Sequence, residues 1–272
     1  GLPSAYREIG YIPGDDDRKK MCCSKSLEYY YNDYLVAQMA KGLGYTEDYE
    51  KYIKRSECWK KLWNPDVESD GFKGYIWPKG KNGDWVEKNE YLPSASFRCT
   101  SWKPYFYEGT CFEYSFFVPH DIDGLISLMG GEELFCERLK YGIDNPKIIC
   151  IENQPGMTQS FLANHTKYPW LTTELTEIQL SRYEKHNTPG CDDSGCFSAW
   201  YVFATIGIYP SAGQDFYYLT SPKYDKTIIR FDSGKEFAII AENLSFDNKY
   251  IQSVTLNGTP HKSAFIRHSD II

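Results

Sequence analysis

The sequence predicts a mainly α-helical fold that is followed by a module of antiparallel β-strands. From Ser26 onwards, aromatic and aliphatic residues recur at the i, i+3, i+4, i+7 and i+8 positions of one helical face, and Gly42 and Gly44 end the run. After Pro210, short β-branched and aromatic runs alternate with turn residues. The change of pattern predicts two parts, residues 1–210 and residues 211–272.

The helical part is expected to consist of helices paired in hairpins. A second helix should follow the first directly, with Thr46 as its N-cap and an apolar side that continues towards Trp63. Residues 64–104 are rich in Gly, Pro, Asn and Asp, and are predicted to form a long irregular loop. Helical patterns return at 121–129, 132–140, 158–185 and 196–206. Paired helices over this length are typical of a bundle or an α/α toroid.

The expected strands lie at 215–220, 226–231, 236–243, 250–256 and 263–268. Asn257-Gly258 lies between the last two of these runs and is the strongest hairpin signal in the chain. These short strands predict an antiparallel module.

Charge and hydropathy narrow the classes of partner. The 272 residues carry 30 Lys and Arg against 37 Asp and Glu, a formal net charge of -7, and no basic run could neutralise a phosphate backbone. We therefore expect no nucleic-acid partner. No apolar stretch is long enough for a membrane segment. The aromatic content of 17% suits a sugar-binding cleft, and it equally suits a large aromatic core.

The cysteines and glycosylation sequons bear on the compartment. Nine cysteines suggest an oxidising environment, although the number is odd and the spacing matches no small disulfide scaffold. Asn-x-Ser/Thr sequons occur at Asn164, Asn243 and Asn257. The cysteines and sequons together favour a secreted or secretory-pathway protein over a cytoplasmic one, and they do not identify a particular compartment.

The first segment that could carry chemistry runs from Glu108 to Asp121. Glu108 and Glu113 lie in an aromatic stretch, and His120 and Asp121 follow it and open a helix. Aromatic surroundings raise the pKa of a carboxyl group and can keep it protonated, as a general acid for glycoside cleavage requires. The alternative is that Glu108 is a surface residue at a glycine turn, while His120 and Asp121 merely cap the helix.

The second segment is the acidic pair Asp192-Asp193, which precedes an apolar helix. Paired aspartates could bind a hard cation or activate water. They could equally cap the helix and complement its dipole. Cys191 and Cys196 flank the pair, but their spacing differs from that of a zinc knuckle. The sequence contains no phosphate-binding loop, no nucleophile elbow and no zinc-protease helix motif.

Taken in chain order, three segments resemble glycoside hydrolase family 92. They are SKSLEYYYNDYLVAQMAKGLG, YEGTCFEYSFFVPHDIDGLISLMGG and PGCDDSGCFSAWYVFATIGIYP. Members of this family cleave terminal mannose from α-mannosides with inversion and with the help of a calcium ion. The resemblance implies a partial (α/α)6 toroid catalytic domain over residues 1–210, followed by strands of a β-sandwich over 211–272. It also implies an N-terminal β-sandwich and further helices ahead of Gly1.

The resemblance assigns roles to particular residues. Glu108 corresponds to the general acid and Asp193 to the general base, with Asp192 beside it. The expected substrate is an α-linked, in particular an α-1,2-linked, mannoside or a glycoprotein glycan. The expected sugar contacts are His120, Asp121, Gln154 and Glu113, and the expected Ca²⁺ ligands are Asn153, Gln154 and Asp192.

Several positions depart from the family pattern. Asn153-Gln154-Pro155 stands where the family commonly has Asn-Glu-Pro, so a neutral amide replaces a charged oxygen group and weaker binding of metal or sugar is expected. Cys191, Cys196 and Phe112-Glu113 also differ. These departures leave open a second class of function, a mannose-binding or scaffold relative of the enzyme. A toroid glycosidase that acts on glucosides would share the fold without these motifs.

Overall fold

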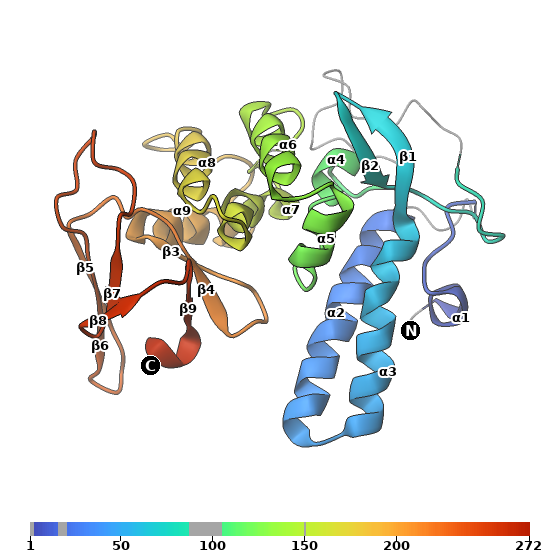
Figure 1. Ribbon diagram of the computed structural model, residues 1–272, viewed down its shortest axis with the longest axis horizontal. Helices are drawn as coiled ribbons and strands as arrows, with labels where there is room; N and C mark the ends of the chain where they lie inside the picture. The colour runs from blue at the N-terminus through green and yellow to red at the C-terminus, as the bar shows by residue number, and fades with distance from the viewer. Residues whose placement is uncertain (1–2, 16–20, 87–104, 150) are drawn as a thin grey trace. The chain divides into compact units, whose positions relative to one another are not determined.

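The chain folds into two compact units, Gly1–Pro155 and Gly156–Ile272. The computed structural model describes residues 3–15, 21–86, 105–149 and 151–272 (Figure 1). The first unit is mostly helical and carries one β-hairpin, whereas the second combines helices with three small antiparallel sheets. This agrees with the predicted helical fold with antiparallel strands. The closure of the helices into a toroid, the sandwich packing and a domain boundary at residue 210 stay predictions.

A long helical hairpin dominates the first unit, as the periodicity predicted. Helices α2 (Cys22–Leu43) and α3 (Thr46–Ser56) run side by side, joined at Gly44, which has a left-handed φ of 79° (Figure 1). Thr46 is the first residue of α3 and makes no capping hydrogen bond, since the N-cap is Tyr45. The chain then tightens into the 3₁₀ helix η1 (Glu57–Leu62), so the predicted extension towards Trp63 is helical but not α-helical.

A buried ionic cluster joins α2 and α3 to the short helix α1 (Ser4–Ile9). The Tyr6 hydroxyl donates to Asp33 Oδ2 at 2.7 Å, and Arg55 donates to both carboxylate oxygens of Asp33 at 2.5 Å. The side chain of Asp33 is only 7% exposed. Such bidentate pairs fix geometry as well as adding energy, so this cluster sets how the three helices pack.

The predicted irregular loop over residues 64–104 is wrong at its start, because the chain forms a hairpin there. Strands β1 (Trp63–Ser69) and β2 (Phe72–Ile76) pair antiparallel across Asp70-Gly71, whose φ angles of 53° and 81° suit a type I′ turn. Asp-Gly is a hairpin signal that the surrounding polar residues conceal. Residues 87–104 of the predicted loop lie outside the described residues.

The remaining helices of the first unit are α4 (Cys111–Tyr114), α5 (Ile122–Leu128) and α6 (Glu132–Asp144), and α7 (Gln154–Met157) spans the boundary between the units. Of these helices, α5 and α6 follow the predicted ranges 121–129 and 132–140, whereas the short helices α4 and α7 were not predicted. Arg138 of α6 reaches the β-hairpin, where its Nη1 donates to the carbonyl of Gly74 at 2.7 Å. The core of this unit is largely aromatic.

In the second unit the predicted helical stretch 158–185 divides into a 3₁₀ helix and an α-helix. The helices are η3 (Gln159–His165), α8 (Trp170–Leu180) and α9 (Cys196–Ile206). One sheet has the order β3 (Ile208–Pro210), β4 (Phe216–Leu219), β9 (Phe265–Arg267). Two hairpins, β5 (Lys226–Arg230) with β6 (Glu236–Ile240) and β7 (Val254–Leu256) with β8 (Thr259–His261), and the 3₁₀ helix η4 (His268–Asp270) complete the unit.

The predicted Asn257-Gly258 hairpin is confirmed, because these two residues form the turn between β7 and β8 with φ angles of 50° and 79°. Across the parts of the chain that the structure describes, we find no helix with the length and apolar character needed to cross a bilayer.

We predict that Asp33→Asn destabilises the protein by about 2–3 kcal/mol, because it leaves the Arg55 guanidinium without a carboxylate in a mostly buried position. Urea unfolding of the full-length protein measures the change. The matched control is Asp144→Asn, which breaks the exposed ion pair between Lys140 and Asp144 and should cost less than about 0.5 kcal/mol. Equal losses from both substitutions would contradict the role of the cluster.

Candidate functional site

Glu108 lies in a tight turn just before α4, and its backbone adopts a left-handed conformation with a φ of 44°. This conformation is uncommon for a residue with a side chain. Its carbonyl oxygen accepts a 2.6 Å hydrogen bond from Asn153 Nδ2, and Asn153 is itself buried. The neighbouring Tyr107 carbonyl accepts a 2.7 Å bond from the Tyr114 hydroxyl. Both sides of the turn are therefore held, and Glu108 is half-buried.

Glu113 is a second carboxylate next to this turn, and it is fully buried within α4. Its backbone N–H donates to the Thr110 side chain, which caps the helix. A Cβ atom at Gly109 would lie 2.9 Å from Glu113 Oε2 and 2.7 Å from the Tyr114 ring, so only glycine fits between them. Burial raises the pKa of the Tyr114 phenol, and the negative charges of Glu113 and Glu108 raise it further.

Asp121 performs the capping role that was the alternative to a sugar contact. Its Oδ1 accepts a hydrogen bond from the Gly124 N–H at 3.0 Å, at the N-terminus of α5. Its Oδ2 accepts from Trp59 Nε1 at 3.1 Å and pairs with Lys60 Nζ at 2.9 Å. The carboxylate thus joins α5 to η1, and its contact with a sugar stays a prediction.

His120 is packed between helices. Its Nε2 donates to the Ser56 carbonyl, 3.1 Å away, and its ring lies 6.0 Å from that of Tyr31 and 5.4 Å from that of Tyr34. Burial lowers the pKa of His120, so the neutral imidazole is favoured. Its predicted role as a sugar contact stays a prediction.

Asn153 and Gln154 differ in exposure although they are adjacent. Asn153 is buried and holds the Glu108 turn through its amide nitrogen. Its Oδ1 atom is then the one that could act as a ligand to a metal ion. Gln154 is the first residue of α7 and is exposed. The structure thus brings Asn153 and Glu113 to Glu108, three residues that the sequence assigned to one site.

The acidic pair of the second unit lies in a loop with a run of left-handed residues. Asp192, Asp193 and Ser194 have φ angles of 60°, 43° and 61°. Asp192 Oδ1 accepts from both the N–H and the hydroxyl of Ser198 in α9, at 2.9 and 2.8 Å. Asp192 therefore accepts from an N–H group in the first turn of α9, whose N-cap is Gly195, while Asp193 is exposed just before the same helix.

Ser198 is a functional candidate that the sequence analysis missed. An acidic residue followed within two turns by Ser is too common a pattern to indicate such a bond. Cys196 shares this loop, and its pKa is raised by burial and then by the charges of Asp193 and Asp192. Within the described ranges, no three acidic, histidine or cysteine side chains cluster as a metal site would require.

A family model described as the glycosyl hydrolase family 92 catalytic domain matches residues 1–272. The class of protein is thus a glycoside hydrolase, and the chain belongs to family 92.

Several relatives support this membership. The chain is 35% identical to an uncharacterized secreted glycosidase of Arthroderma benhamiae over 98% of its own length and 37% of the relative's. The α-mannosidase BT3965 of Bacteroides thetaiotaomicron in complex with mannoimidazole is 30% identical, with a TM-score of 0.86 over 98% of this chain and 36% of that one. The inverting mannosidase BT2199 of the same bacterium is 25% identical, with a TM-score of 0.83 over 98% and 38%. The chain spans little more than a third of each relative.

We predict that His120→Asn makes stability less sensitive to acid. The folded state lowers the pKa of His120, so the unfolded chain takes up this proton first as the pH falls through about 6.5, and unfolding is favoured. Asn removes this proton uptake while it can still donate to Ser56. The urea midpoint should therefore fall less between pH 7.5 and pH 5.5 in the variant than in the wild type. His186→Asn, at an exposed position, is the control and should follow the wild type.

Proposed function

We propose that the full-length protein hydrolyses terminal α-linked mannose, with Glu108 as general acid and Asp193 as general base. The observation that carries this proposal is family membership together with the similarity to solved α-mannosidases over nearly the whole chain. Local geometry supports it. Both residues lie on loops with constrained left-handed backbones, a feature that is frequent where side chains must be held for chemistry.

The proposed reaction requires opposite proton transfers from the two carboxyl groups. Glu108 donates a proton to the departing glycosidic oxygen, while Asp193 removes a proton from the water that attacks the opposite face of the anomeric carbon. Inversion requires room for that water, so we expect the two carboxyl groups to lie roughly 6.5–9.5 Å apart in the full-length protein. A separation well beyond about 12 Å, in a crystal structure of that protein, would remove this pair from consideration.

Neighbouring residues position the two groups. Asn153 holds the backbone of Glu108, and Ser198 holds Asp192. Because one oxygen of Asp192 already accepts two hydrogen bonds, we assign the base role to the exposed Asp193 and a supporting role to Asp192.

The residues expected to bind calcium are compatible with it in chemistry. Asn153 Oδ1, the Gln154 amide oxygen and the second carboxylate oxygen of Asp192 are hard oxygen donors of the type Ca²⁺ takes. With only one carboxylate among them, weak binding is expected. A bound calcium ion would supply positive charge that orients the sugar hydroxyls.

We further propose that the substrate is an α-1,2-linked mannoside or an N-glycan and that the protein is secreted. The name of the Arthroderma relative, a secreted glycosidase, supports secretion. The exposed sequons at Asn243 and Asn257 support it too, whereas Asn164 of the third sequon is buried and its amide donates to the carbonyls of Leu219 and Ala264.

Glu108→Gln and Asp193→Asn should each lower kcat/KM for α-1,2-linked mannobiose by about 10²–10⁴-fold, because each removes one proton transfer. Glu152→Gln alters an exposed glutamate next to Asn153 and should leave turnover within twofold of the wild type. Proton NMR of the first product should show β-mannose. Mannobiose binding by a wild-type protein without turnover would instead favour the mannose-binding relative.

Removal of calcium by a chelator should abolish most turnover. The substitution Gln154→Glu should tighten calcium binding at least threefold, because it adds a charged oxygen ligand. Calorimetric titration of the full-length protein with Ca²⁺ measures the second effect. Gln252→Glu adds the same charge at an exposed position of the second unit and serves as control. Full activity after exhaustive chelation would contradict the calcium assignment.

A further inference from the structure

Glu177, near the C-terminal end of α8, is the centre of a charged cluster in the second unit. Its Oε1 accepts a hydrogen bond from Lys223 Nζ at 2.6 Å, and its Oε2 accepts one from Lys249 Nζ at 2.8 Å. Partial burial alone would raise the pKa of Glu177, but the two ammonium groups lower it. The carboxylate is therefore charged at neutral pH, and both lysines are already paired with it.

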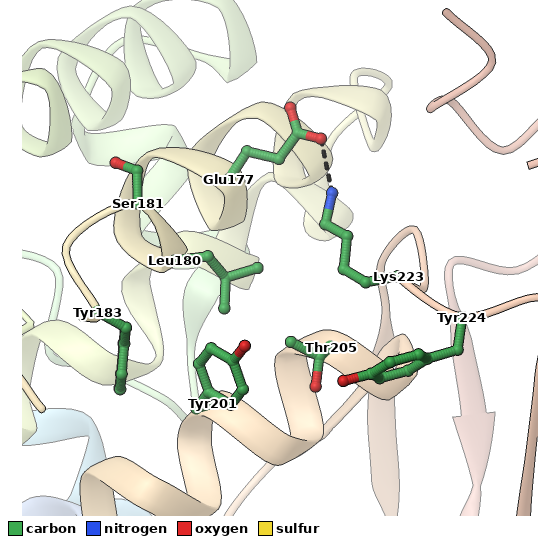
Figure 2. A pocket seen from close by; sticks show the side chains of 8 residues that line it. All are labelled: Glu177, Leu180, Ser181, Tyr183, Tyr201, Thr205, Lys223 and Tyr224. Atoms are coloured by element: carbon green, nitrogen blue, oxygen red, sulfur yellow. Dashed lines mark hydrogen bonds and ion pairs between the residues drawn. The ribbon is translucent and has the colours of Figure 1, made fainter. Parts of the chain in front are cut away.

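A wide-open surface cavity of about 370 Å³ lies beside this cluster. Figure 2 shows the lining side chains of Leu180 and Tyr201 near each other, with Thr205 and Tyr224 to one side and the Glu177–Lys223 ion pair above them in the view. The side chains of Tyr201 and Tyr224 are 39% and 50% exposed. The volume falls within the range of small-molecule sites and is large enough for a single sugar ring.

The lining fits a neutral polyhydroxylated ring better than an ion or a purely apolar ligand. Flat tyrosine rings can pack against the C–H face of a pyranose. A hydroxyl group both donates and accepts, so it matches a carboxylate acceptor lying next to an ammonium donor. Among the described residues, the hydroxyls of Tyr201 and Tyr224 have no hydrogen-bond partner and remain available. Lys223 is the cation among the lining residues, and because it is paired with Glu177 the lining offers no unpaired ammonium group to an anion.

The cavity is separate from the acidic pair. Thr205 lies near the C-terminal end of α9 and Tyr201 at its middle, whereas Asp193 precedes its N-terminus. From Cys196 to Thr205 this helix rises about 13.5 Å at 1.5 Å per residue. A ring bound in the cavity would therefore not be the ring at Asp193. We propose that this cavity is a second carbohydrate site, which binds a neutral hexopyranose unit of a glycan and performs no catalysis.

Affinity electrophoresis of the full-length protein in gels that contain soluble α-mannan tests the site. A Glu108→Gln background prevents hydrolysis during the run. In that background Tyr224→Ala and Tyr201→Ala should each raise the apparent Kd for α-mannan at least threefold, and Tyr224→Trp should retain binding because it keeps a flat ring. Phe246→Ala is the matched control, since Phe246 is a 96% exposed aromatic residue of the same unit outside the cavity.

In the active background, Tyr224→Ala should turn over a small chromogenic α-mannoside at a rate within twofold of the wild type. The proposal is overturned if both alanine variants migrate like the wild type, if Tyr224→Trp loses as much binding as Tyr224→Ala, or if turnover of the small substrate falls with binding. Retardation that depends on Tyr224 in a protein without turnover would support the second site while refuting the proposed hydrolysis.

Discussion

The packing of the first unit depends on one buried cation. The guanidinium of Arg138, whose residue is 1% exposed, lies 4.1 Å from the ring centre of Tyr75 and 5.0 Å from that of Phe112. Burial lowers its pKa to about 10, so it stays charged at neutral pH. The faces of aromatic rings attract such a charge, most strongly where water is excluded. One side chain of α6 thereby holds both the β-hairpin, through Gly74 and Tyr75, and α4, through Phe112.

The position of the proposed acid follows from that packing. Phe112 and Glu113 are consecutive residues of α4, and Gly109 packs directly on the Glu113 carboxylate and the Tyr114 ring. The Glu108 turn therefore lies on a helix whose buried face is fixed by Arg138. In the second unit, hydrogen bonds from Ser198 anchor Asp192 to α9. They support a run of residues with left-handed backbone conformations that would otherwise be unfavourable.

Local sequence patterns predicted most helices and strands, because helical periodicity and turn residues act over a few positions. The β1–β2 hairpin was missed because polar residues conceal its Asp70-Gly71 turn, and its contact with Arg138, more than sixty residues further along the chain, is not visible in a local pattern. Motif resemblance singled out Glu108 and the acidic pair as candidate catalytic residues. It could not reveal that Asp121 binds Trp59 and Lys60, or that residues from Glu177 to Tyr224 form a cavity, since such contacts depend on tertiary packing.

The cysteines of the described segments are free thiols, and among them only Cys191 is exposed. This thiol immediately precedes Asp192-Asp193, the pair that includes the proposed base. Among the seven described cysteines, a maleimide-linked fluorophore would therefore attach fastest to Cys191 at the edge of the acidic loop, while the buried thiols of α2 and α4 would react slowly. The natural sequence thus already carries an attachment point from which the local environment of this loop can be followed optically, without the introduction of a new cysteine.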